Sequence, residues 1–175
     1  MQMLPRRRLS RVVLAALFAA AVVPAALHAQ RAKPGIGADG TPLWSRTLRM
    51  PDGRTFVSDG AIALDAALAK PKEMPKQVIP EAGSKVIEKF MAGPFEHEYT
   101  VAQLRAAGSN PRAYEAPSGV SLGADYVDYI ARTVGKRSVR FRVNGDRDPI
   151  AIVADGKAVG VLMPRAPARD AAKGK

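Results

Sequence analysis

The sequence contains no cysteine, one tryptophan and two histidines among its 175 residues. The absence of cysteine excludes disulfide bonds, thiolate chemistry and zinc sites of the cysteine type. Only His97 lies beyond the N-terminal apolar stretch, so a catalytic triad would have to use that single histidine. Phosphate-binding loops of the Walker or dinucleotide type are also absent. We therefore predict a protein that is not an enzyme and holds no cofactor or metal.

The N-terminus has the three parts of an export signal. Four arginines at positions 6–8 and 11 precede an apolar run, 12–27, and Ala29 offers a small residue at the cleavage position. The apolar run is short for a membrane span. We predict a cleaved signal peptide at 1–29, a mature chain that starts near Gln30, a periplasmic or secreted location, and no stable membrane span after cleavage. An uncleaved anchor and a buried core helix are the alternatives, and the export route is either Sec or twin-arginine.

The mature chain is basic. From Gln30 onward it carries 23 lysines and arginines against 16 aspartates and glutamates, a net charge of +7. Such a surface favours nucleic acid, anionic lipid or acidic partners through its general field. Its length suits a single domain. We predict a flexible leader at 30–42, which is rich in glycine and proline, a globular domain at 43–165, and a disordered tail at 166–175.

Two hairpins and one further strand are indicated by turn residues and alternation. The first hairpin joins 43–50 to 54–57 through an Asp-Gly turn, and the second joins 150–154 to 158–163 in the same way. Apolar and basic residues alternate over 139–143, which predicts a half-buried strand with a basic outer face.

Helices are expected between these hairpins. Residues 84–91 place Val86, Ile87, Phe90 and Met91 on one side, and 124–134 place an apolar face before Gly135. The sequence from Thr100 to Gln103 matches a capping box. The predicted fold class is α+β, with helices packed on one face of a mainly antiparallel sheet.

His97 lies between two carboxylates, Glu96 and Glu98. A histidine in this setting could bind a metal or transfer a proton. However, neighbours in sequence diverge on a strand and on a helix. A polar loop before the capped helix is the favoured interpretation.

A basic stripe precedes the second hairpin: Lys136, Arg137, Arg140 and Arg142. On a strand Arg140 and Arg142 point the same way, so they could contact the phosphates of a nucleic acid, weakly and without sequence preference. The favoured alternative is an ordinary solvated strand face that also blunts a sheet edge.

Five segments, in this order, resemble the C-terminal third of the bacterial sliding clamp, the beta subunit of DNA polymerase III. They are Phe56–Gly60, Val78–Pro80, Leu122–Ile130, Pro149–Ile152 and Val161–Arg165, and the last contains a Met-Pro-Arg ending. The resemblance implies a clamp-like domain that binds DNA or polymerase-type peptides. It also implies a peptide-binding pocket at Gly60, Val161, Met163 and Pro164, where a flexible methionine suits a peptide anchor.

Clamps work on DNA in the cytoplasm, whereas an export signal is predicted at residues 1–29 of this chain. We therefore interpret the sequence as an exported, non-enzymatic binding protein of the cell envelope, with a protein or peptide partner that the sequence does not identify. A sliding-clamp-like, nucleic-acid-associated protein is the alternative.

Overall fold

The computed structural model describes residues 35–107, 109–110, 112–135, 138–145 and 147–165. All of these residues fall within one compact unit, residues 32–175. The predicted signal peptide at 1–29 and the predicted tail at 166–175 lie outside the described residues, and so do Lys136 and Arg137.

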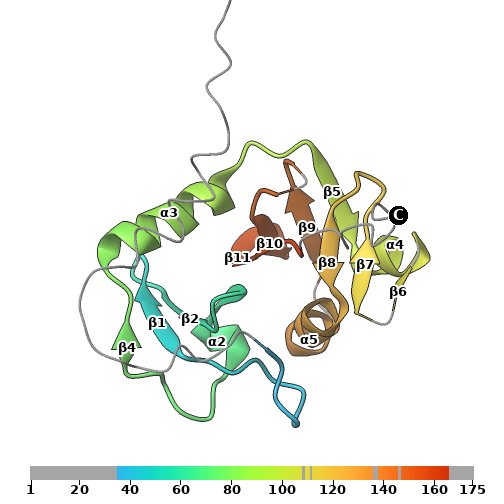
Figure 1. Ribbon diagram of the computed structural model, residues 1–175. Coiled ribbons are helices and arrows are strands. Elements are labelled where there is room, and N and C mark those ends of the chain that lie inside the picture. The colour runs from blue at the N-terminus through green and yellow to red at the C-terminus, as the bar shows by residue number, and fades with distance from the viewer. Residues whose placement is uncertain (1–34, 108, 111, 136–137, 146, 166–175) are drawn as a thin grey trace, which may run out of the picture. The chain divides into compact units, whose positions relative to one another are not determined.

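The described part contains eleven strands and four helices (Figure 1). The strands are β1 (Arg46–Arg49), β2 (Thr55–Ser58), β3 (Ile62–Asp65), β4 (Gln77–Val78), β5 (His97–Thr100), β6 (Ser109–Asn110), β7 (Ala113–Glu115), β8 (Ser121–Gly123), β9 (Val139–Val143), β10 (Ile150–Ala154) and β11 (Lys157–Leu162). The helices are α2 (Ala66–Ala69), α3 (Glu81–Ala92), α4 (Val101–Ala106) and α5 (Ala124–Val134).

Eight of the strands form one sheet in the order β4-β1-β2-β3-β11-β10-β9-β5. Every pair in this sheet is antiparallel except β4 with β1. A second, antiparallel sheet has the order β6-β7-β8. The predicted α+β class with a mainly antiparallel sheet is therefore confirmed.

Both predicted hairpins are present. β1 and β2 pair around the turn at Asp52-Gly53, and β10 and β11 pair around Asp155-Gly156. Asp155 and Gly156 both have positive φ, 49° and 77°, as the two central residues of a type I′ hairpin turn require. The strand β9 also alternates as predicted, with Val139, Phe141 and Val143 buried.

Helices cover both faces of the eight-stranded sheet, which corrects the prediction of a single covered face. Ile87 and Met91 of α3 pack with Phe56, Ala63 and Val161 in one hydrophobic cluster. The alternate positions Val57, Ile62, Leu64 and Leu162 pack with α5 in another. The physical reason is visible in β10, where all five residues are buried, so each face needs a cover. Figure 1 shows α3 and α5 on either side of β10 and β11.

Helix α3 is longer than predicted, and it buries a different face from the predicted one. It starts at Glu81 after Pro80, and its buried residues are Ser84, Ile87 and Met91. Val86, which the sequence analysis placed on the buried side, is 37% exposed. Helix α5 matches its prediction, and the capping box of α4 forms, with the Thr100 hydroxyl accepting from the Gln103 N–H.

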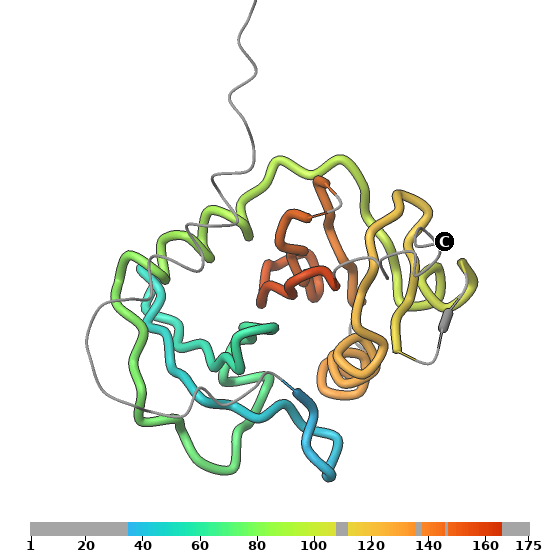
Figure 2. The backbone as a smooth tube through the Cα atoms, in the orientation of Figure 1, coloured from blue at the N-terminus to red at the C-terminus, as the bar shows by residue number. Residues whose placement is uncertain are grey.

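Part of the predicted leader belongs to the fold, so the leader prediction is corrected for residues 35–42. The Gly37 N–H donates to the Thr41 carbonyl, and the Arg132 guanidinium donates to the Gly40 carbonyl. Hydrogen bonds from the hydroxyl and N–H of Thr41, together with Lys72, lower the pKa of Asp39 to about 2. Figure 2 shows this blue segment beside the orange helix α5. Glycines and prolines here make an ordered turn because side chains of the domain hold it.

Candidate functional site

Arg140 and Arg142 of β9 point away from the larger hydrophobic cluster, the one that contains Phe141. Phe141 is fully buried, so Arg140 and Arg142 on either side of it point to the opposite face of the sheet. In the neighbouring strand β5, Glu98 stands opposite Arg142 and Thr100 stands opposite Arg140. The predicted common orientation of the two arginines is therefore present.

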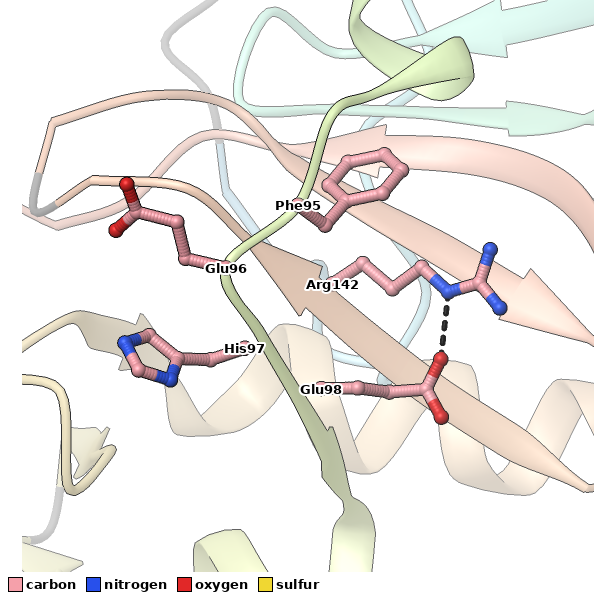
Figure 3. A pocket seen from close by; sticks show the side chains of 5 residues that line it. All are labelled: Phe95, Glu96, His97, Glu98 and Arg142. Carbon is pink, nitrogen blue, oxygen red and sulfur yellow. Dashed lines mark hydrogen bonds and ion pairs between the residues drawn. The ribbon is translucent and has the colours of Figure 1, made fainter.

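One carboxylate bridges the two arginines. Glu98 Oε2 accepts from Arg142 Nε at 2.5 Å, and Glu98 Oε1 lies 3.3 Å from an Arg140 nitrogen. The Arg142 guanidinium also lies over the Phe95 ring, 5.8 Å from its centre (Figure 3). We call Phe95, Glu98, Arg140 and Arg142 the arginine face. The arginine side chains are 46% and 36% exposed, and the three charges leave a net +1.

The arginine face borders an open depression of about 280 Å³, lined by Phe95, Glu96, His97, Glu98 and Arg142. These side chains do not converge. Figure 3 shows Glu96 and His97 on one side of the chain, with Phe95, Glu98 and Arg142 on the other. The depression is therefore open, and the side chains that line it point apart.

His97 is the first residue of β5, which corrects the predicted polar loop. Pairing with Val143 of β9 draws this segment into the sheet. The His97 ring stacks on Tyr99, with ring centres 6.1 Å apart and planes 26° apart. Within the described ranges, no three histidine, aspartate or glutamate side chains gather as metal ligands would. The neighbours Glu96 and Glu98 do not form one cluster with the imidazole.

The basic strand is not at the sheet edge, so that part of the alternative interpretation is also corrected. β5 is the last strand on this side of the sheet, and β9 lies one strand inside. The Asp155 N–H donates to the Ser138 carbonyl, so the backbone groups of Ser138, Arg140 and Arg142 point to β10 and those of the residues between them point to β5. In β5, the backbone groups of Glu98 and Thr100 therefore point outward, away from β9. The Thr100 N–H already donates to Gln103 Oε1 at 2.8 Å. The edge therefore offers only one residue for strand addition.

The residues implied by the clamp resemblance lie partly together. The Met163 N–H donates to the Ala61 carbonyl at 2.7 Å, so Met163 lies beside the turn that contains Gly60. Gly60 is exposed, and Met163 and Pro164 are half-buried. Val161 is only 4% exposed and packs under α3, so it does not line a surface. Whether Gly60, Met163 and Pro164 bind a peptide stays a prediction.

Asp59, which sequence reasoning did not single out, is the most connected carboxylate of this region. It is 3% exposed and accepts from the N–H groups of Ala61 at 2.8 Å, Ile62 at 3.0 Å and Gly35 at 3.2 Å. The Tyr126 hydroxyl donates to it at 2.6 Å. Burial, and then this hydrogen bond, raise the pKa of Tyr126 well above its ordinary value. The Asp-Gly turn was visible in the sequence, but its tyrosine partner 67 positions away was not.

Charge in the described part is nearly balanced. The chain from Gln30 onward has a net charge of +7. The described residues carry 16 lysines and arginines against 14 aspartates and glutamates, a net charge of +2. Of the four residues predicted to bind nucleic acid, Arg140 and Arg142 share Glu98, while Lys136 and Arg137 lie outside the described residues. The part of the chain that the structure describes holds no helix of the length and apolarity needed to cross a bilayer.

Comparison of the chain with protein-family models, with curated proteins and with solved structures gives no match.

Proposed function

We propose that the protein is an exported, non-enzymatic binding protein of the cell envelope that contacts acidic groups of a protein or peptide partner through the arginine face. The observation that carries this proposal is the Glu98 carboxylate held between Arg140 and Arg142. It defines a place where two guanidinium groups meet one carboxylate, and guanidinium groups match carboxylates in geometry and charge.

The arginine face is preorganised for such a contact. Phe95 supports the Arg142 guanidinium from one side and Glu98 fixes it from another, which reduces the entropy that a partner must remove on binding. Both arginines stay more than a third exposed. Export is supported by the basic, apolar and small-residue order of residues 1–29. The diverging side chains around His97 favour contact over catalysis.

An acidic peptide of glutamates with a fluorescent label tests this proposal by anisotropy. Arg140→Ala/Arg142→Ala should abolish binding. Glu98→Gln should strengthen it about fivefold, because an exposed competing carboxylate contributes up to about 1 kcal/mol. Lys157→Ala, at the exposed first residue of β11, is the matched control and should change nothing. If Glu98→Gln and the double variant both bind as the wild type does, the arginine face is not the binding surface.

The alternative of a sliding-clamp-like protein has one observation in its favour, the Met163 to Ala61 hydrogen bond that joins the two sides of the pocket which the resemblance implies. In that case the protein binds DNA, and Arg140 and Arg142 neutralise phosphates. Removal of both arginines would then reduce the slope of log affinity against log salt by about 2. A slope near zero for the wild type contradicts the alternative.

A further inference from the structure

A proline- and lysine-rich segment, residues 70–80, leads from α2 to α3, and its part from Pro75 to Ile79 lines the other edge of the eight-stranded sheet. We call it the edge strap. It contains β4, which pairs with β1 through Arg46 and Thr47. The Thr47 hydroxyl donates to the Pro75 carbonyl at 2.7 Å, and the Ile79 N–H donates to the Thr47 carbonyl at 2.8 Å. The edge strap is therefore fixed to the sheet at two points.

Two large apolar side chains of the edge strap are exposed. Met74 is 48% exposed and Val78 is 56% exposed. Ile79 packs on the hydrophobic cluster under α3, so its neighbour Val78 points to the other face. Val78 stands beside Thr47, whose hydroxyl holds Pro75, so both Pro75 and Val78 contact β1 on this edge. Met74 directly precedes Pro75 in the same segment.

Positive charge surrounds these two side chains in the sequence. Lys70, Lys72 and Lys76 share the edge strap with one acid, Glu73. Lys72 pairs with Asp39 at 3.2 Å, whereas Lys70 and Lys76 make no ion pair with any described residue. Lysines and prolines are common devices that protect a sheet edge from pairing with another strand. Edge protection does not explain the exposed methionine and valine, which would favour association.

We propose that the edge strap docks the protein onto an anionic lipid surface. Met74 and Val78 enter the headgroup region, while Lys70 and Lys76 lie at the level of the lipid phosphates. Prolines at 71, 75 and 80 lack the N–H that an added protein strand would need, whereas a lipid surface needs no backbone pairing. This inference does not depend on the arginine face, which lies on β9 and β5 at the opposite end of the sheet.

Vesicle sedimentation tests the proposal with the chain from Gln30 onward. Vesicles of equal parts phosphatidylglycerol and phosphatidylcholine should bind the protein at low salt, and vesicles of phosphatidylcholine alone should not. Lys70→Ala/Lys76→Ala should weaken binding about 25-fold, since each lysine contributes about fivefold near an anionic surface. Met74→Asp/Val78→Asp should weaken it at least about tenfold.

Leu43→Asp is the matched control, because Leu43 is 51% exposed and lies outside the edge strap. It should bind within about twofold of the wild type. Circular dichroism confirms that each variant is folded. Three results would overturn the proposal. The wild type does not bind vesicles that contain phosphatidylglycerol, it binds both kinds of vesicle equally, or Leu43→Asp loses as much vesicle binding as the edge-strap variants. Loss of lipid binding in Arg140→Ala/Arg142→Ala alone would assign the lipid contact to the arginine face instead.

Discussion

The buried Asp59 carboxylate offers a demanding test of the packing described above. Asp59→Ala removes the shared acceptor of four donors: three backbone N–H groups and the Tyr126 hydroxyl. The Ile62 N–H is buried, so leaving it unpaired costs about 1–3 kcal/mol. The other three are partly buried and can regain water, at about 0.5–1 kcal/mol each. We expect a total loss of about 2.5–6 kcal/mol in the free energy of unfolding.

The isosteric change separates shape from charge. In Asp59→Asn the amide oxygen still accepts from Ala61 and Ile62, but the amide nitrogen faces the Gly35 N–H as donor against donor. We expect a loss of about 1–2 kcal/mol. Urea denaturation measures these losses through far-ultraviolet circular dichroism and through the fluorescence of Trp44, the one tryptophan in the chain.

Asp128→Ala is the control, because Asp128 also accepts from a tyrosine hydroxyl, that of Tyr114, but its side chain is 41% exposed. Its loss should stay below about 1 kcal/mol. Equal losses in Asp59→Ala and Asp128→Ala would refute the reasoning, and so would an Asp59→Asn protein as unstable as Asp59→Ala.

The Tyr126 contact adds a pH signature. The pKa of Tyr126 is raised in the folded state, mainly by burial and then by Asp59. A raised pKa means that its contribution to stability is present below the unfolded value of about 10 and is lost as pH rises above it. The loss is at most about 1.4 kcal/mol per pH unit. Tyr126→Phe should therefore flatten the alkaline decline in stability, and an unchanged decline would contradict this assignment.

Three further substitutions follow from the packing. Ser84→Ala should keep or raise the free energy of unfolding, because the Ser84 hydroxyl is buried without a hydrogen-bond partner in the described structure. A fall of more than about 1 kcal/mol in that free energy would reveal a missed partner. Gly160→Ala should cost at least about 1–3 kcal/mol by urea denaturation, since the added Cβ would lie 2.4 Å from the Ala63 carbonyl oxygen; a neutral result would mean that the strands separate easily. His97→Ala should change stability by less than about 1 kcal/mol, because it loses one exposed ring contact; loss of function in a folded protein would reveal a role for the imidazole.

Patterns with short range were predictable from sequence. The Asp-Gly turns marked both hairpins, because Asp-Gly readily supplies the positive φ that Gly53 adopts in the first turn and that Asp155 and Gly156 adopt in the second. The alternation in β9 and the capping box at Thr100 were also sufficient by themselves. Each of these features is decided by residues within a few positions of one another.

Features that depend on distant partners were not predictable. β5 contains three titratable residues, His97, Glu98 and Tyr99, and forms a strand only because β9 pairs with it. Glu98 meets Arg140 and Arg142 across more than 40 positions, and the leader is ordered by Arg132 and Asp59. The sequence therefore identified the arginines but not the carboxylate that holds them.

Cell fractionation with mass spectrometry of the protein's N-terminus tests the central claim, an exported binding protein, most directly. The account predicts a mature chain that begins at or near Gln30 and is recovered from the periplasm or the medium. Soluble cytoplasmic protein that retains Met1 would contradict it and would favour the nucleic-acid-associated alternative.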